Sequence, residues 1–300
     1  MERSTLSWSF ASASARAKAE GEKTRTTQSR VQDATVSRLR APESTRPNLV
    51  SSAKAERGST MIATSVRASL TAEDMRLAVE LLGKSGVERH RLSQRAVEEG
   101  PDALWDDPRL MGALVQSRDL RRPSPSLFFY VVLRRLLLEL DVDDRTLTDY
   151  CAAMVLAFGR GDRAYRVGEH EENRYAYLVD LIAEAGRAEG ERQFRVRVHL
   201  GNFSLWLTGI FPDYIAARRT RKGGPPLPYY EALGRKGFLM ASDHTLARQY
   251  GMIGVLRSAG ERFGELRVAL NRLSDRLMFP HHHSPERLMR QVEDEFRLAG

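Results

Sequence analysis

The sequence predicts an all-α fold, a multi-helix domain with orthogonal or bundle-like packing around one buried central helix. Apolar residues recur with helical spacing from residue 71 to the end of the chain, and cap residues and prolines divide this pattern into segments. No segment has the strict two-residue alternation of a strand. No internal repeat of about 20–50 residues is present. About nine helices are therefore expected.

The central helix is predicted between Arg195 and Pro212. From Val198 to Phe211 the chain carries no formal charge, and apolar side chains cover every sector of a helical projection. This pattern is typical of a helix that is buried on all sides. The run is shorter than the roughly 20 residues that span a bilayer, so no membrane span is expected. A ridge of small residues would let a neighbouring helix approach closely, and it consists of Gly201, Ser204 and Thr208.

Residues 1–64 are predicted to be a disordered basic tail, and residues 65–300 a single all-helical domain. The tail is rich in Ser, Thr, Ala and Arg and poor in large aliphatic residues, so it buries too little apolar surface to offset the entropy of ordering. Residues 1–60 hold 11 Lys and Arg against 6 Asp and Glu, more than half of the chain's net charge of +8. The sequence leaves open whether translation starts at Met1 or at Met61.

Helix starts are predicted from capping residues. Thr71 and Asp74 have the spacing of a capping box, and Ser124 precedes a proline at the first helical position. Asp143 and Asp144 precede another apolar face. Further helices are expected from Glu171 to Ala188, after Pro228, after Ser242-Asp243 with at least one break before Met278, and from Ser284 with Leu288, Val292 and Phe296 facing inward.

The motifs of known metal and phosphate sites are missing from the sequence. No glutamate stands three residues before any of the seven histidines, as carboxylate-bridged di-iron bundles require. The run His281–His283 is predicted to be a surface loop, and Asp102–Asp107 a turn anchored by Trp105. Gly83-Lys84-Ser85 lacks the upstream glycine of a phosphate loop. Neither a metal nor a cofactor is expected, and the single cysteine, Cys151, is predicted to be a core thiol.

The dense basic run at the end of one predicted helix is a candidate set of phosphate contacts: Arg218, Arg219, Arg221 and Lys222. Arg and Lys are also favoured at a solvated helix C-terminus, where the helix dipole is negative. The run has no aromatic platform and no helix-turn-helix pattern beside it. Weak binding of phosphate groups stays open, but nucleic-acid binding is not expected.

A set of polar residues on and near the central helix is the remaining candidate site. Buried polar groups need hydrogen-bond partners, so such a set is either a structural network or the lining of a pocket. The structural interpretation is favoured. The candidate pocket residues are His199, Asn202, Trp206, Tyr230, Asp243 and His244.

The sequence therefore favours a soluble, cytoplasmic helical protein that acts as a non-enzymatic interaction or regulatory module. The alternative is a small-molecule enzyme or sensor with a pocket beside His199 and Asn202. The expected partner is another protein or a small molecule.

Overall fold

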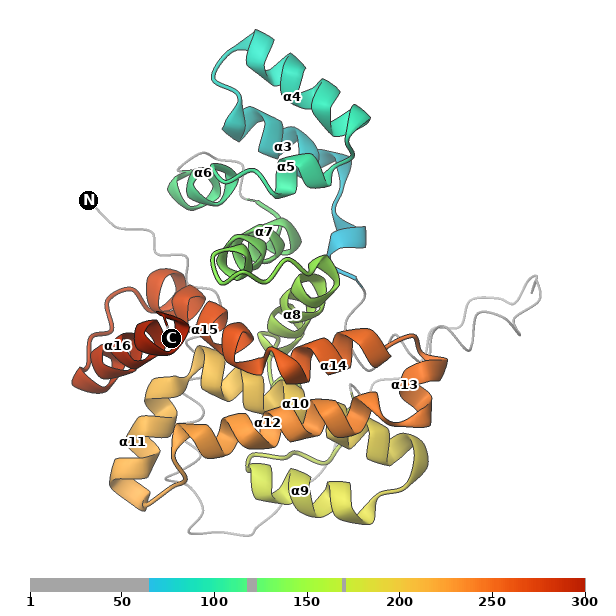
Figure 1. Ribbon diagram of the computed structural model, residues 1–300, viewed down its shortest axis with the longest axis vertical. Helices are drawn as coiled ribbons and strands as arrows, with labels where there is room; N and C mark the ends of the chain where they lie inside the picture. Colours follow the sequence, from blue (N-terminus) through green and yellow to red (C-terminus); the bar gives the residue numbers. More distant parts are fainter. Residues whose placement is uncertain (1–64, 118–122, 169–170, 300) are drawn as a thin grey trace, which may run out of the picture.

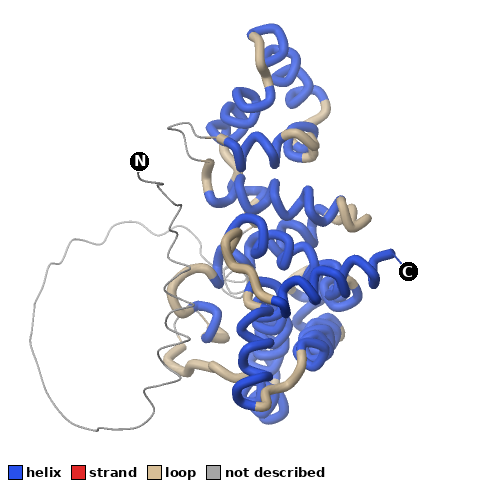
Figure 2. The backbone as a smooth tube through the Cα atoms, turned by 90° about the vertical axis from the view of Figure 1, so that its left-hand side faces the viewer, coloured by secondary structure: helices blue, strands red, loops and turns tan. Residues whose placement is uncertain are grey.

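The computed structural model describes residues 65–117, 123–168 and 171–299, and every regular element in these ranges is a helix (Figures 1 and 2). The all-α prediction is confirmed for this part of the chain, whereas residues 1–64 lie outside it. The helices are more numerous than the nine or so predicted, because short turns divide several segments. The α-helices are α3 (Ala72–Leu82), α4 (Gly86–Glu98), α5 (Asp102–Trp105), α6 (Leu110–Gln116), α7 (Pro125–Leu138), α8 (Arg145–Phe158), α9 (Leu178–Arg187), α10 (Gly190–Ile210), α11 (Pro212–Lys222), α12 (Leu227–Ser242), α13 (Thr245–Gln249), α14 (Ile253–Glu261), α15 (Phe263–Leu273) and α16 (Pro285–Ala299). The 3-10 turns are η1 (Arg67–Ser69) and η2 (Arg163–Tyr165), and the turn η3 (Ser274–Met278) is π-helical.

Helix α10 is the predicted central helix, and the structure confirms that it is buried. It packs against α9, α12 and α15, and its side chains from Phe194 to Ile210 are almost all inaccessible to solvent. Figure 1 places α3 to α6 at one end of the molecule and α9 to α16 at the other, with α7 and α8 between them. Buried apolar residues from Val66 to Leu273 form one connected core cluster. This continuity favours a single domain, which stays a prediction.

Two of the three small residues in the ridge on α10, Gly201 and Ser204, face α12, as the sequence predicted for a close helix neighbour. A Cβ atom at Gly201 would lie 2.6 Å from the ring of Phe238. A Cβ atom at Gly237 would lie 2.9 Å from the backbone nitrogen of Gly201 and 3.0 Å from the carbonyl oxygen of Arg197. These three distances are shorter than nearly all Cβ contacts in folded proteins, so α10 and α12 can approach this closely only because positions 201 and 237 are glycines.

Three predicted helix starts are confirmed by their caps. Thr71 and Asp74 form the reciprocal capping box of α3. The Ser124 hydroxyl accepts a hydrogen bond from the backbone N–H of Leu127 at 3.0 Å, and the Asp144 carboxylate accepts one from the N–H of Leu147 at 2.9 Å. Each cap satisfies one of the backbone donors that a helix start leaves free.

Two predicted helix starts were wrong. The helix expected from Glu171 begins only at Leu178, because the backbone before it bonds elsewhere: the N–H of Tyr175 donates to the Tyr165 carbonyl at 2.7 Å. Ser242-Asp243 does not cap a new helix, since α12 continues through Ser242. The next helix, α13, is capped instead by His244, whose Nδ1 accepts from the N–H of Leu246 at 3.2 Å.

The orientation predicted for the last helix was also wrong. Leu288, Val292 and Phe296 were expected to face the core, yet their exposed fractions are 61%, 41% and 75%. The physical reason lies in the contacts that the opposite face of α16 makes.

Candidate functional site

The polar residues of α10 lie inside the core. His199, Asn202 and Trp206 are 3%, 4% and 4% exposed. The Oδ1 atom of Asn202 accepts a hydrogen bond from the hydroxyl of Tyr150 on α8 at 2.8 Å. The Trp206 indole meets the rings of Phe158 and Phe211 edge to face, at centroid distances of 5.9 and 5.5 Å. Asn202 and Trp206 therefore have the environment of core residues.

His199 is a neutral imidazole among aromatic rings. Its ring stacks on that of Phe203 at 6.0 Å and lies 5.5 Å from that of Phe158. Burial, with a smaller effect from the positive charge of Arg163, lowers the pKa of His199 to about 3, although a hydrogen bond with the backbone of Ala164 opposes this shift. Its Nε2 atom is buried and has no hydrogen-bond partner among the described residues.

The other three candidate pocket residues do not join this group. Tyr230 and Asp243 lie at opposite ends of α12, about 20 Å apart for a helix that rises 1.5 Å per residue. Asp243 is exposed and forms an ion pair with Arg257 at 2.9 Å. His244 caps α13 and lies against the ring of Phe194. The structure thus brings together three of the six candidates, namely those on α10.

The candidate phosphate contacts lie at the C-terminal end of α11. Arg219, Arg221 and Lys222 are exposed, and Gly223 ends the helix with a left-handed backbone, at φ 61°. The guanidinium of Arg218 lies 4.8 Å from the centre of the Tyr177 ring. Neither of the two surface hollows described below is lined by any of these four side chains.

Two open hollows lie elsewhere on the surface. The first, of about 430 Å³, is lined by Glu171, Glu172, Asn173, Glu184 and Arg192. The second, of about 300 Å³, lies where α15 and η3 meet α16, and its lining includes Asp275, Arg290 and Asp294. Neither is lined by a candidate pocket residue. Within the described ranges no three His, Cys, Asp or Glu side chains come together as metal ligands. The Nε2 atom of His282, in the predicted surface loop, lies 3.2 Å from the carboxylate of Asp213.

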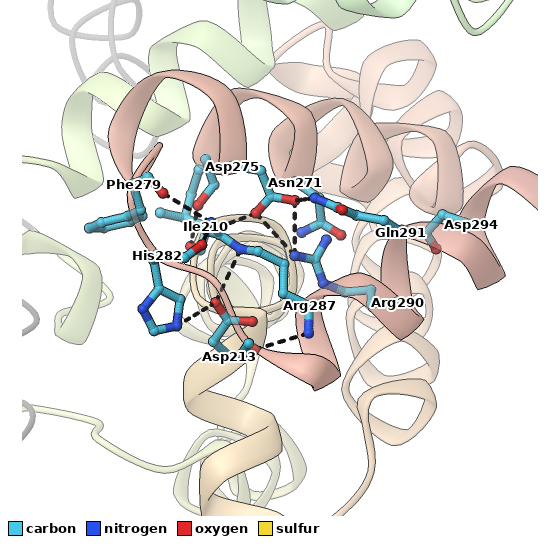
Figure 3. A network of polar contacts seen from close by, with 12 residues as sticks. Ile210, Asp213, Asn271, Asp275, Phe279, His282, Arg287, Arg290, Gln291 and Asp294 are labelled. Atoms are coloured by element: carbon cyan, nitrogen blue, oxygen red, sulfur yellow. Dashed lines mark hydrogen bonds and ion pairs between the residues drawn. The ribbon is translucent and has the colours of Figure 1, made fainter.

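A network of ion pairs holds α16 against the rest of the molecule (Figure 3). Arg267 on α15 contacts Asp294 through two hydrogen bonds, of 2.8 and 2.5 Å, and its Nε lies 2.6 Å from Glu231 on α12. Burial disfavours the charge on Arg267, but the hydrogen bond to Asp294 and the two carboxylates outweigh it and raise the pKa of Arg267. This interaction ties α12, α15 and α16 together.

The π-helical turn η3 supplies the second part of the network. Its Asp275 accepts from Arg290 at 3.0 Å and lies 2.9 Å from the Nη2 of Arg287. Arg287 also approaches Asp213 on α11 at 3.4 Å. We call the arginines of this network, Arg267, Arg287 and Arg290, the arginine clamp; each is less than 10% exposed.

Side chains of the same region donate hydrogen bonds to the last carbonyl groups of α10. Asn271 donates to the carbonyl oxygens of Thr208 and Gly209 at 2.8 and 2.7 Å, and the Ser274 hydroxyl donates to that of Ile210 at 2.8 Å. The last carbonyls of a helix have no partner within the helix. The central helix and the clamp therefore form one connected polar region.

The clamp determines which face of α16 points outward. Arg287, Arg290 and Asp294 are 6%, 9% and 6% exposed. With 3.6 residues per turn, the middle of this polar face is about 180° from the middle of the apolar face. We call that apolar face the outer face of α16; it consists of Leu288, Met289, Val292 and Phe296, all more than 40% exposed.

The sequence contains a signal for this arrangement that the apolar periodicity alone does not reveal. Arg287, Arg290 and Asp294 are spaced i, i+3 and i+7, which makes them a second, polar stripe on the same helix. Their partners stand far away in the sequence, at residues 213, 267 and 275. Because only the fold brings these charges together, the usual rule that the apolar stripe faces inward was the wrong one here.

Comparisons of this chain with models of known protein families, with curated proteins and with solved structures gave no match. None of the described helices combines the length and the apolarity that crossing a bilayer requires.

Proposed function

We propose that this chain is a non-enzymatic interaction module and that the outer face of α16 binds an amphipathic helix of a partner protein. The observation that carries this proposal is the orientation of α16, with its charges buried and its large apolar side chains in solvent. Leu288, Val292 and Phe296 follow one another at i+4 spacing, so they are neighbours along one stripe. A contiguous exposed apolar patch commonly marks a protein-interaction site.

The orientation is not one that α16 could relax by turning over. A turn of about half a revolution would place the four apolar side chains of the outer face against the charged groups of Arg267 and Asp275, where they would bury little apolar surface. It would also leave Asp275 without any of its partners and Arg267 with Glu231 alone, and removing one partner of a buried ion pair costs roughly 3–5 kcal/mol for each pair. The clamp therefore keeps the outer face of α16 exposed to solvent, where it can bind another molecule.

The geometry of α16 supports a helix as the occupant. Its 15 residues extend about 22 Å, which matches four turns of a second helix packed alongside. A contact of this size lies at the lower end of specific interfaces, so a transient complex is expected.

The test uses a fluorescently labelled designed peptide, helical, with leucines spaced i, i+3, i+4 and i+7 and with glutamine and alanine at all other positions. Its binding to the full chain is measured by fluorescence anisotropy. We expect the double variant Leu288→Ser, Phe296→Ser to bind the peptide at least tenfold more weakly than the wild type. Both side chains are largely exposed, so the melting temperature should not change.

The matched control is Val87→Ser, Val97→Ser, which removes two exposed apolar side chains on α4. It should bind the peptide like the wild type. Equal binding by the two double variants, or no binding by the wild type, would contradict the proposal.

A second candidate function, a small-molecule sensor or enzyme with a site beside His199 and Asn202, is favoured by one observation. The buried Nε2 of His199 lacks a partner, and a buried polar atom without one calls for an explanation. The stability of His199 variants, considered in the Discussion, distinguishes this candidate from a structural role.

A further inference from the structure

Among the side chains of α16 that the structure describes, every exposed charged one is acidic. Glu286, Glu293 and Glu295 are exposed, whereas Arg287 and Arg290 are buried in the arginine clamp. The amino-acid composition of the helix conceals this asymmetry, since it holds basic and acidic residues in similar numbers. The fold turns the described arginines inward and leaves an acidic border in solvent.

The glutamates flank the outer face on both sides. In a helical projection of 100° per residue, Glu286 and Glu293 lie along one edge of the apolar stripe and Glu295 along the other. Glu295 forms an ion pair with Arg272 at 3.0 Å but remains 71% exposed. An incoming helix would therefore place its own flanking residues opposite carboxylates.

We propose that the partner helix is basic: an amphipathic helix whose apolar stripe is bordered by lysine or arginine. This inference rests on the proposed function and adds the charge that selects the partner. Complementary charges at the border of an interface steer association and suppress wrong partners.

The same border argues against a second copy of this chain as the occupant. In a symmetric antiparallel pair of α16 helices, the edge with Glu286 and Glu293 would face the same edge of the other copy. In a parallel pair it would face the edge with Glu295. The parallel arrangement places carboxylates opposite carboxylates, which is unfavourable, and the sedimentation experiment below tests the antiparallel one.

The experiment compares two further peptides with the neutral one described above. All three share the same leucine stripe, and the residues bordering it are glutamine, lysine or glutamate. Binding to the full chain is measured at low ionic strength, about 50 mM, and again at about 0.5 M salt, where surface charges are screened. We expect the lysine peptide to bind at least tenfold more tightly than the glutamate peptide at low salt, and this preference to shrink at high salt.

The variant Glu286→Lys, Glu293→Lys should reverse the preference between the two charged peptides. Its control, Glu73→Lys, Glu98→Lys, makes the same change in net charge with exposed residues on α3 and α4 and should preserve the preference.

Different results separate the two proposals. If the neutral peptide binds at the outer face but the lysine and glutamate peptides bind equally, the inference about charge is wrong and the proposed function stands. If none of the peptides binds, both are wrong. A concentration-dependent dimer in sedimentation, abolished by Leu288→Ser, Phe296→Ser, would overturn the inference in favour of a second copy.

Discussion

Arg267 on α15 and Asp294 on α16 form a two-fold hydrogen-bonded ion pair in the interior, although 27 residues separate them in the sequence. The two residues are 2% and 6% exposed. Paired guanidinium and carboxylate groups have the geometry that best compensates for lost hydration. The pair therefore fixes both the position of α16 and the direction of its outer face.

The change Asp294→Asn is expected to lower the free energy of unfolding by about 3 kcal/mol, because it leaves the buried Arg267 with Glu231 as its remaining carboxylate. Urea denaturation followed by circular dichroism measures this loss. The neighbouring change Glu293→Gln affects an exposed side chain and serves as the control, with an expected effect below about 0.5 kcal/mol. Equal effects of the two changes would show that the pair does not hold α16.

The contact between α10 and α12 predicts opposite outcomes for two Gly→Ala changes. Gly237→Ala would place a Cβ atom 2.9 Å from backbone, so the helices must separate, and we expect a loss of about 1–3 kcal/mol or more. Gly254→Ala on α14 meets nothing within 4 Å and should be neutral or stabilising by up to about 1 kcal/mol. Thermal unfolding of the two variants, compared under one set of conditions, measures the difference. A Gly237→Ala protein as stable as the Gly254→Ala protein would disprove the close approach.

The lowered pKa of His199 leads us to expect that the stability of the protein depends on pH. This pKa is about 3 in the folded protein and 6.5 in an ordinary histidine, so between these values the unfolded chain binds the additional proton. Stability is therefore fully present above about pH 6.5 and decreases as the pH falls below it, by up to about 1.4 kcal/mol per pH unit. The measurement is the free energy of unfolding between about pH 5 and 6.5, where most carboxylates are still ionised. The variant His199→Leu should show a smaller slope, and an unchanged slope would contradict the prediction.

The change His199→Ala distinguishes the structural role from the pocket. If the ring is a core residue, its removal leaves a cavity beside Phe158 and Phe203 and leaves the Ala164 backbone without its partner, which costs about 1–3 kcal/mol. We expect this outcome at neutral pH in thermal unfolding. A variant at least as stable as the wild type would instead favour the small-molecule site.

The local structure of this chain followed from its sequence because it depends on neighbouring residues. The caps at Thr71, Ser124 and Asp144 and the break at Pro212 involve partners within four residues. The burial of α10 followed from the absence of charge between Val198 and Phe211, since a helix that is apolar on every side has no face for water. Gly201 and Ser204 indicated the close neighbour, although not that it would be α12.

The position of the charged partners was decided by the tertiary structure alone. Periodicity shows that α16 has an apolar and a polar stripe, but burying either one requires a complementary surface. That surface is assembled from Asp213, Arg267 and Asp275, which three separate elements bring to one place. Because a buried charge is stabilised only by partners in contact with it, the fold determined that the arginines turn inward and that Leu288 and Phe296 face solvent.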